Sequence, residues 1–312
     1  MSLETPGLLI TFNRADTVAQ VLAALRLHRP TRLYWAGDAA RPHKPGEAER
    51  VAETRALVQQ VDWPCAIKTL FHDQNLGCRQ GVSAAISWFF AHEEAGIILE
   101  DDTVPGPDMP AYCTQLLERY WHHPQVYHIG TNQYNPHMRH HPYSYFASQI
   151  PHVWGWATWR HKWAAYQEAE ALLTATDRVP ELRPEQAPPY LGAFFSQKLE
   201  AVRRGEIDAW SYLWAYAILQ RGGIALAPRV NLTTNIGMGI QVAGANFSGV
   251  SARATFGFFP TYPLLPLQHP PSLAVNQRAD HWTYRQVLHW GLWRKIKSKL
   301  WTTWERLVLR IC

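Results

Sequence analysis

Residues 66–102 read AIKTLFHDQNLGCRQGVSAAISWFFAHEEAGIILEDD. Two short apolar runs, 66–71 and 95–100, flank a segment in which apolar residues recur every three or four positions. Short apolar runs joined by an amphipathic helix are typical of parallel strands, because a parallel pair needs a crossover connection. This stretch therefore predicts a β-strand, a helix over 77–92 and a second β-strand.

The same rhythm extends back to the start of the chain. Apolar runs occupy 7–12 and 31–37, and helical patterns follow them over 15–27 and 47–61. We therefore predict an α/β fold with a mixed, mainly parallel sheet flanked by helices. In such sheets ligands bind at the carboxyl ends of the strands, so the residues that follow each strand are the first candidates for a site.

The pattern changes after Pro105. A helix is expected over 109–121, a strand over 125–131 and a loop rich in Pro, His and Tyr over 135–145. A tryptophan-rich segment, a proline-rich connection and a glycine-rich loop follow, with helices expected over 194–204 and 210–220. The regular alternation of strand and helix therefore belongs to the first part of the chain.

Composition restricts the class of protein. The chain has 312 residues, of which 47% are hydrophobic and 18% charged, as in globular proteins with a sizeable core. It contains no apolar run of about 18 residues, and its first residues do not have a signal-peptide profile, which argues against a bitopic or secreted protein. Four widely spaced cysteines suggest neither a zinc site nor a disulfide framework. We expect reduced thiols and a cytoplasmic location.

The positive charge of the chain is concentrated at its end. Residues 260–280 contain five prolines and are expected to form an extended linker. In residues 285–312, apolar side chains share one helical face and Lys and Arg lie opposite. This basic amphipathic pattern favours an anionic membrane surface, while a helix docked on its own domain and a nucleic-acid stripe are the alternatives. Five tryptophans from Trp282 onward favour the inner face of the membrane as partner rather than nucleic acid.

Three consecutive carboxylates, Glu100, Asp101 and Asp102, stand at the expected carboxyl end of a strand. Like charges so close repel one another unless a cation binds them. A divalent cation, Mn²⁺ or Mg²⁺, uses one or two carboxylates together with phosphate oxygens and neutralises a leaving diphosphate. A solvated acidic turn is the alternative.

Four segments together resemble a known family. NLGCRQGVSAAISWFF (75–90), GIILEDD (96–102), HVWGWATWRHKW (152–163) and NLTTNIG (231–237) resemble, in this order, bacterial nucleotide-diphospho-sugar transferases of the GT-A fold. The acidic triplet also resembles the EDD motif of the N-acetylglucosaminyltransferase type. The resemblance spans roughly residues 7–250.

The resemblance implies a glycosyltransferase. Such an enzyme transfers a sugar from a nucleotide-diphosphate donor, with a UDP-sugar favoured, to a hydroxyl of a cell-surface glycan or a lipid-linked precursor, with inversion and a divalent cation. It also implies a nucleotide-sugar-binding half over 1–125 and an acceptor or catalytic half over 126–259. Residues 260–312 then form the linker and the basic tail.

The resemblance also assigns residues. Asp102 falls on the metal ligand, and Glu100 and Asp101 fall on contacts to the ribose and sugar of the donor. The remaining donor-binding set is Thr11, Asn13, Arg14, Asp38, Arg41, Asn75, Gly77 and Arg79. Asp38 is expected to accept the N–H of a uracil, and the arginines to pair with phosphate. Helix capping and turn chemistry are the alternatives for Asn13, Asp38 and Gly77.

The acceptor is expected on the tryptophan-rich segment. Trp154, Trp156, Trp159 and Arg160 fall on the acceptor side of the resembling family, where sugar rings stack on indole faces. Core packing is the alternative for these indoles.

The catalytic base departs from the family pattern. The family carries an Asp after a Trp in this region, whereas here the residue after Trp210 is Ser211 and the nearest carboxylate is Asp208. Either Asp208 takes the acceptor proton, or Ser211 marks a weakened enzyme, since a serine alone is too weak a base. The structural alternative for Asp208 is that it forms the N-cap of the helix expected to begin near Ala209.

Two further features bear on function. The loop 237–249, GMGIQVAGANFSG, lacks the Thr-His pair of the family, so we expect a metal held by fewer protein ligands or by Asn246 through water, and a weaker metal dependence. These departures leave a catalytically silent sugar-nucleotide or glycan-binding protein as the alternative function. A nucleotidyltransferase is disfavoured because TFNRAD (11–16) lacks the Gly-rich phosphate loop with Arg and Lys that usually follows the first strand in such enzymes.

Overall fold

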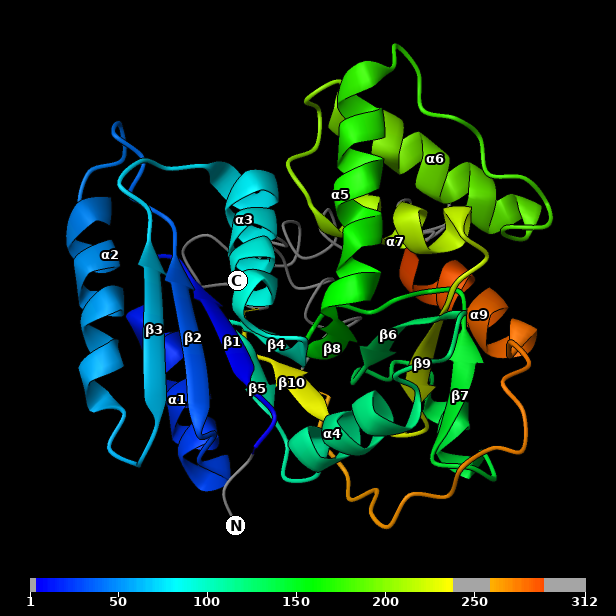
Figure 1. Cartoon of the computed structure of the whole chain (residues 1–312), viewed down its shortest axis with the longest axis horizontal. Helices are drawn as coiled ribbons and strands as arrows, with labels where there is room; N and C mark the ends of the chain where they lie inside the picture. Colours follow the sequence, from blue (N-terminus) through cyan, green and yellow to red (C-terminus); the bar gives the residue numbers. More distant parts are fainter. Residues whose placement is uncertain (1–3, 238–258, 289–312) are drawn as a thin grey trace, which may run out of the picture.

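The computed structural model describes residues 4–237 and 259–288, and in this part of the chain the main feature is an eight-stranded sheet. Its strand order is β3-β2-β1-β4-β8-β6-β9-β7, with β3 at one end and β7 at the other (Figure 1). The strands are β1 (Gly7–Thr11), β2 (Arg32–Gly37), β3 (Ala66–Phe71), β4 (Ala95–Glu100), β6 (Val126–Gly130), β7 (Tyr145–Ser148), β8 (Trp156–Trp159) and β9 (Ile224–Pro228).

The sheet is mixed and mainly parallel, which confirms the predicted fold class. Strands β1 to β4 are parallel to one another. Strand β8 runs antiparallel to both β4 and β6, while β6 and β9 are parallel and β7 closes the sheet antiparallel to β9. The four strands of this sheet that come from residues 1–125 therefore form one side of it, and the four that come from residues 126–259 form the other.

Helices cover both faces of the sheet. They are α1 (Ala15–His28), α2 (Glu47–Ala56) with the 3₁₀ turn η1 (Leu57–Gln60), α3 (Gly77–His92), α4 (Met109–Arg119), α5 (Arg160–Ala175), α6 (Pro189–Arg203) and α7 (Ser211–Gln220). Apolar side chains of α1 and α4 pack on one face with Leu9 and Leu99. Those of α3, α5 and α7 pack on the other with Leu8 and Ile98. Alternate residues of each strand therefore face different cores.

A small second sheet lies beside the end of β4. Strand β10 (Thr233–Asn235) pairs antiparallel with β5 (Thr103–Pro105), so that Asn235 lies opposite Thr103. Thr103 fixes the turn that carries the acids, because its hydroxyl accepts the amide of Glu100 (2.8 Å) and donates to its carbonyl (2.9 Å). This arrangement brings the NLTTNIG segment against the acidic triplet.

The linker predicted over 260–280 is packed on the body of the protein. The amides of Leu264 and Leu265 donate to Asp108, and Leu264 is buried in the core. The 3₁₀ turn η2 (Pro136–His140) precedes β7, and the helix α9 (Gln277–Thr283) with the π-helical turn η3 (Tyr284–Leu288) ends the described chain. Residues 260–274 form no helix or strand, as their prolines predict, but they pack on the protein.

The membrane-binding helix predicted over 285–312 lies, beyond residue 288, outside the described residues, as does the loop 237–249, with Asn246, beyond Gly237. Among the helices that the structure describes, none combines the length and the apolar character needed to cross a membrane.

Candidate active site

A cavity of about 350 Å³ opens at the carboxyl ends of β1, β2 and β4. This volume lies within the range of small-molecule sites. The lining includes most of the residues predicted to bind a donor, together with the predicted base: Thr11, Asn13, Arg14, Asp38, Arg41, Asn75, Gly77, Glu100, Asp101 and Asp208. The sequence therefore located the cavity, and the roles of these residues remain predictions.

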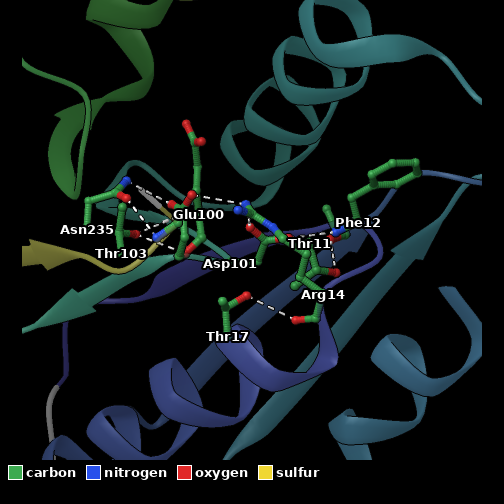
Figure 2. A network of polar contacts seen from close by, with 11 residues as sticks. Thr11, Phe12, Arg14, Thr17, Glu100, Asp101, Thr103 and Asn235 are labelled. Carbon is green, nitrogen blue, oxygen red and sulfur yellow. Dashed lines mark hydrogen bonds and ion pairs between the residues drawn. The ribbon is translucent and has the colours of Figure 1, made fainter. Parts of the chain in front are cut away.

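Arg14 binds the acidic triplet at one end of this cavity. Its Nη2 donates to Asp101 Oδ1 and, over 3.0 Å, to Asp102 Oδ2. In Figure 2, Arg14 reaches from the end of β1 toward the acids, and Asn235 approaches them from the other side. Only 17% of the Arg14 side chain is exposed, so this is a largely desolvated charge cluster.

Desolvation shifts the proton equilibria of this cluster. Burial raises the pKa of Glu100 to about 8, and the charges of Asp102 and Asp101 add to the shift. Burial also raises the pKa of Asp101 to about 6 although Arg14 opposes it. For Arg14, burial lowers the pKa, but the two aspartates outweigh it and the net pKa is raised. Arg14 is therefore a permanent cation, whereas Glu100 is largely protonated at neutral pH.

The other side of Asp102 is held by an oriented amide. Asn235 Nδ2 donates to Asp102 Oδ1 (3.1 Å), and Asn235 Oδ1 accepts the backbone N–H of Gly237 (2.9 Å). Because the oxygen of the amide is taken by this N–H, its NH₂ group faces Asp102. The backbone amide of Ile236 also donates to the Asp102 carbonyl (2.8 Å).

The predicted metal does not fit this arrangement. Asp102 Oδ2 binds Arg14 and Oδ1 binds Asn235, while Asp101 binds Arg14 and accepts the amide of Phe12 (3.2 Å). Four carboxylate oxygens thus each face a protein donor. Over residues 4–237 and 259–288, no group of three or more His, Cys, Asp or Glu is arranged to hold a metal ion.

A buried carboxylate that the sequence did not point out holds two lining residues of the cavity, Asn13 and Arg41. Glu47, at the start of α2, accepts from Asn13 Nδ2 (3.0 Å) and from Arg41 Nε (2.9 Å). The hydrogen bond from Arg41 lowers the pKa of Glu47 to about 2. The guanidinium of Arg41 also lies 5.5 Å from the centre of the Phe12 ring. Asn13 and Arg41 are therefore held in place before any ligand binds.

Asp38 has a structural role in place of the predicted contact to uracil. Its carboxylate accepts the amides of Leu76 (2.9 Å) and Gly77 (3.0 Å) at the start of α3, and Asn75 Nδ2 (2.9 Å). Its own chain neighbour, the amide of Ala39, donates to it as well (2.9 Å). With these donors in place, Asp38 shapes the wall of the cavity rather than offering a free acceptor.

Asp208 meets the same helix from the other side. Its Oδ2 accepts the amide of Cys78 (2.8 Å) and its Oδ1 the amide of Arg79 (2.9 Å). Helix α7 begins at Ser211 and its N-cap is Trp210, so Asp208 is not the N-cap of this helix, which was the alternative to a catalytic role. Asp208 lines the cavity and Ser211 does not.

Arg79 was predicted to bind the donor, but it does not line the cavity. Its Nη1 forms an ion pair with Glu170 of α5 (3.0 Å). The amides at the start of α3, which would attract a phosphate, already donate to Asp38 and Asp208. The anion site predicted at this helix end is therefore filled by two carboxylates of the protein itself.

The tryptophan-rich segment divides between core and surface. Trp156 and Trp159 are 0% exposed, so the prediction that they contact an acceptor is wrong. Trp156 stacks on His128 and Trp210, with ring centres 4.9 and 5.6 Å apart. Trp156 and Trp159 lie on opposite faces of β8, a central strand, and each packs in a different core, with Ala157 and Thr158 between them.

Trp154 precedes β8 and is partly exposed. Its ring meets Tyr134 edge-on, 5.5 Å between centres, and Tyr134 also meets Phe259 at 5.5 Å. The carbonyl of Trp154 accepts from Thr131, which bonds Thr233 two residues before Asn235. Trp154 therefore belongs to an aromatic cluster on the second half of the sheet, joined by hydrogen bonds to the strand that carries Asn235.

Arg160 lies at the wrong edge of the sheet for its predicted role. Because β8 is antiparallel to β4, Trp159 pairs with Ala95 at the amino end of that strand. Arg160 follows Trp159 and forms an ion pair with Glu94 (2.6 Å). The cavity lies at the carboxyl end of β4, so Arg160 does not contribute to it.

Comparisons with known proteins do not establish a family. No family model and no curated protein matches the chain. A candidate glucose-1-phosphate thymidylyltransferase from Bacillus anthracis, solved with sucrose, is similar over 77% of this chain and 93% of its own, with 9% identity and a TM-score of 0.43.

Two other solved structures are similar to a lower degree. The UTP-bound UGPase from Acinetobacter baumannii matches 72% of this chain and 85% of its own, with 9% identity and a TM-score of 0.33. The apo glycosyltransferase GlyE of Streptococcus pneumoniae TIGR4 matches 55% of this chain and 39% of its own, with 12% identity and a TM-score of 0.28. All three TM-scores are below 0.5, so the function is argued from the site.

Proposed function

We propose that the cavity binds a nucleotide-diphosphate sugar and that the protein transfers the sugar to a hydroxyl of a glycan or of a lipid-linked precursor. The observation that supports this most is that the cavity lining combines an aromatic ring with a largely buried cation. The Phe12 ring lies beside the guanidinium of Arg41. Arg14 reaches the acids, whereas the Phe12 ring points away from them (Figure 2). We place the nucleoside on Phe12 and the diphosphate at Arg14.

The residues at the diphosphate end suit a leaving nucleotide. In transfer, a bond forms between the acceptor oxygen and the anomeric carbon, and the bond from that carbon to the β-phosphate oxygen breaks. The electron pair goes to the diphosphate, where Arg14 stabilises the developing charge. Glu100, protonated at neutral pH because burial raises its pKa to about 8, donates a hydrogen bond to a phosphate or sugar oxygen.

Asp208 is our proposed proton acceptor. It is an exposed carboxylate on the rim of the cavity, so an acceptor hydroxyl that enters from solvent reaches it. The amides of Cys78 and Arg79 fix its orientation and leave further lone pairs on both oxygens. The aromatic cluster around Trp154 is our proposed acceptor platform.

The nucleotide site is tested by thermal stabilisation of the purified protein with UDP, GDP, CDP and dTDP. We expect one of these to stabilise the wild type. Phe12→Ala should lower the affinity for that nucleotide by about 5- to 150-fold, the usual loss when a base loses an aromatic stacking partner. Leu27→Ala is the control, because Leu27 is 80% exposed on α1 and does not line the cavity. Equal binding by the Phe12 variant and the control would reject this orientation.

A further inference from the structure

The acidic triplet carries its own cation. Arg14 contacts Asp101 and Asp102 with a single nitrogen, Nη2. A guanidinium has five N–H donors, and within the described residues the side-chain hydrogen bonds of Arg14 all come from Nη2. Arg14 also lines the cavity, so we place the diphosphate within reach of the donors that Asp101 and Asp102 do not use.

The surrounding residues hold this pair closed. Asn235 covers the second oxygen of Asp102, and its amide is oriented by Gly237. A Cβ atom at Gly237 would collide with Asp102 Oδ2 and would lie 2.7 Å from Arg14 Nη1. Glycine at this position therefore lets the backbone approach the ion pair closely, and the approach fills the space beside the carboxylate that a metal ion with its water shell needs.

We infer that Arg14 takes the place of a divalent cation at the acidic triplet, so that the cavity binds a nucleotide diphosphate without a metal. The inference rests on the proposed function and specifies how the site holds the diphosphate. Asp101 and Asp102 then act as positioning residues, because they hold the guanidinium rather than a metal. An arginine suits this role because its charge is permanent and its planar donors match phosphate oxygens.

The test repeats the thermal stabilisation by nucleotides, once in excess EDTA and once in Mn²⁺. For the wild type we expect the same nucleotide to stabilise the protein in EDTA, with no further gain from Mn²⁺. Titration of Mn²⁺ alone, followed by electron paramagnetic resonance, should leave the ion free. Stabilisation only in the presence of Mn²⁺ would overturn the inference and leave the proposed function standing. Absence of stabilisation in both conditions would reject the nucleotide site itself.

Arg14→Gln supplies the second arm. In EDTA it should lose about 10- to 100-fold in nucleotide affinity, as expected for one charge-assisted hydrogen bond. In Mn²⁺ it should regain affinity, because two carboxylates are released for the ion. Undiminished binding by this variant in EDTA would also overturn the inference. Arg26→Gln is the matched control, since Arg26 pairs with Asp62 on the surface. If Arg14→Gln fails to fold by circular dichroism, the two wild-type titrations still decide.

Discussion

Asp38 and Asp208 accept hydrogen bonds from four successive backbone amides at the start of α3, Asp38 from Leu76 and Gly77 and Asp208 from Cys78 and Arg79. The first four amides of a helix have no partner within it, and here two carboxylates from distant parts of the chain take that place. One follows β2 and the other precedes α7, so the helix end joins the two halves of the protein at the cavity.

Gly77 is the position where this junction tolerates no side chain. Its φ is +78°, and a Cβ would lie 2.8 Å from Asp208 Oδ2. We expect Gly77→Ala to lower the free energy of unfolding by more than the roughly 1–2 kcal/mol of left-handed backbone strain, and to reduce turnover by displacing Asp208. Urea denaturation and kcat measure the two effects.

The control for this change is Gly205→Ala. Gly205 has a φ of +72° and no atom within 4 Å of its added Cβ, so the variant has the strain without the collision. If both variants lose equal stability and keep equal turnover, the contact with Asp208 has no consequence.

Asp208→Asn tests the proposed base. The amide oxygen of asparagine still accepts a backbone N–H, so we expect a folded protein with unchanged nucleotide affinity. Turnover should fall by about 10²- to 10⁴-fold, the usual contribution of a general base. Ser211→Ala should leave turnover unchanged, because Ser211 does not line the cavity. The assignment is wrong if the Asp208 variant turns over like the wild type.

Trp154 and Trp156 should respond differently to truncation. Trp156→Ala removes a fully buried indole, and we expect a loss of about 3–5 kcal/mol in the free energy of unfolding. Trp154→Ala removes a partly exposed ring and should cost less stability while raising KM for the acceptor. Chemical denaturation and acceptor kinetics distinguish the two. An unchanged KM would exclude Trp154 from the acceptor platform.

The docking of α9 should depend on pH through Asp280. This carboxylate is 2% exposed and accepts from Ser148 (2.6 Å) and from the amide of Gln149 (2.8 Å). Burial raises its pKa from 3.8 to about 6. Its stabilising contribution is therefore complete below about pH 4 and is lost as pH rises through about 6, by about 3 kcal/mol in total.

Asp280→Asn removes this titration. Relative to the variant, the wild type should lose stability between about pH 4 and pH 7, which denaturation at a series of pH values measures. A difference between the two proteins that stays constant over this range would show that Asp280 is not the titrating group.

The first half of the fold could be predicted closely because its signals are local. The strands predicted over 66–71 and 95–100 and the helix predicted over 77–92 match β3, β4 and α3 in their bounds. Each combines a short apolar run or a regular helical period with a clear break, which is what a single sequence encodes. Topology then brought the ends of β1, β2 and β4 together at the predicted cavity.

The failures concern relationships that only the fold defines. Arg160 was misplaced because the antiparallel direction of β8 is not readable from its sequence. Glu47 was missed because nothing in the helical pattern marks one acid of α2 as buried. Asn235 belongs to the segment NLTTNIG (231–237) that supported the resemblance, but its contact with Asp102 depends on the pairing of β10 with β5. The contacts of residues that act across such strand pairings can be identified only from the structure.

Sugar transfer is detected by ³¹P nuclear magnetic resonance of the reaction mixture. In the first mixture, the protein is incubated with the nucleotide sugar whose nucleotide stabilises it and with a glycan or lipid-linked acceptor. In a second, parallel mixture it is incubated with the corresponding nucleoside triphosphate and sugar 1-phosphate. We expect a free nucleoside diphosphate in the first mixture, in an amount that falls in Asp208→Asn, and no pyrophosphate in the second. Pyrophosphate in the second mixture, or an unchanged donor in the first, would reject the proposed sugar transfer.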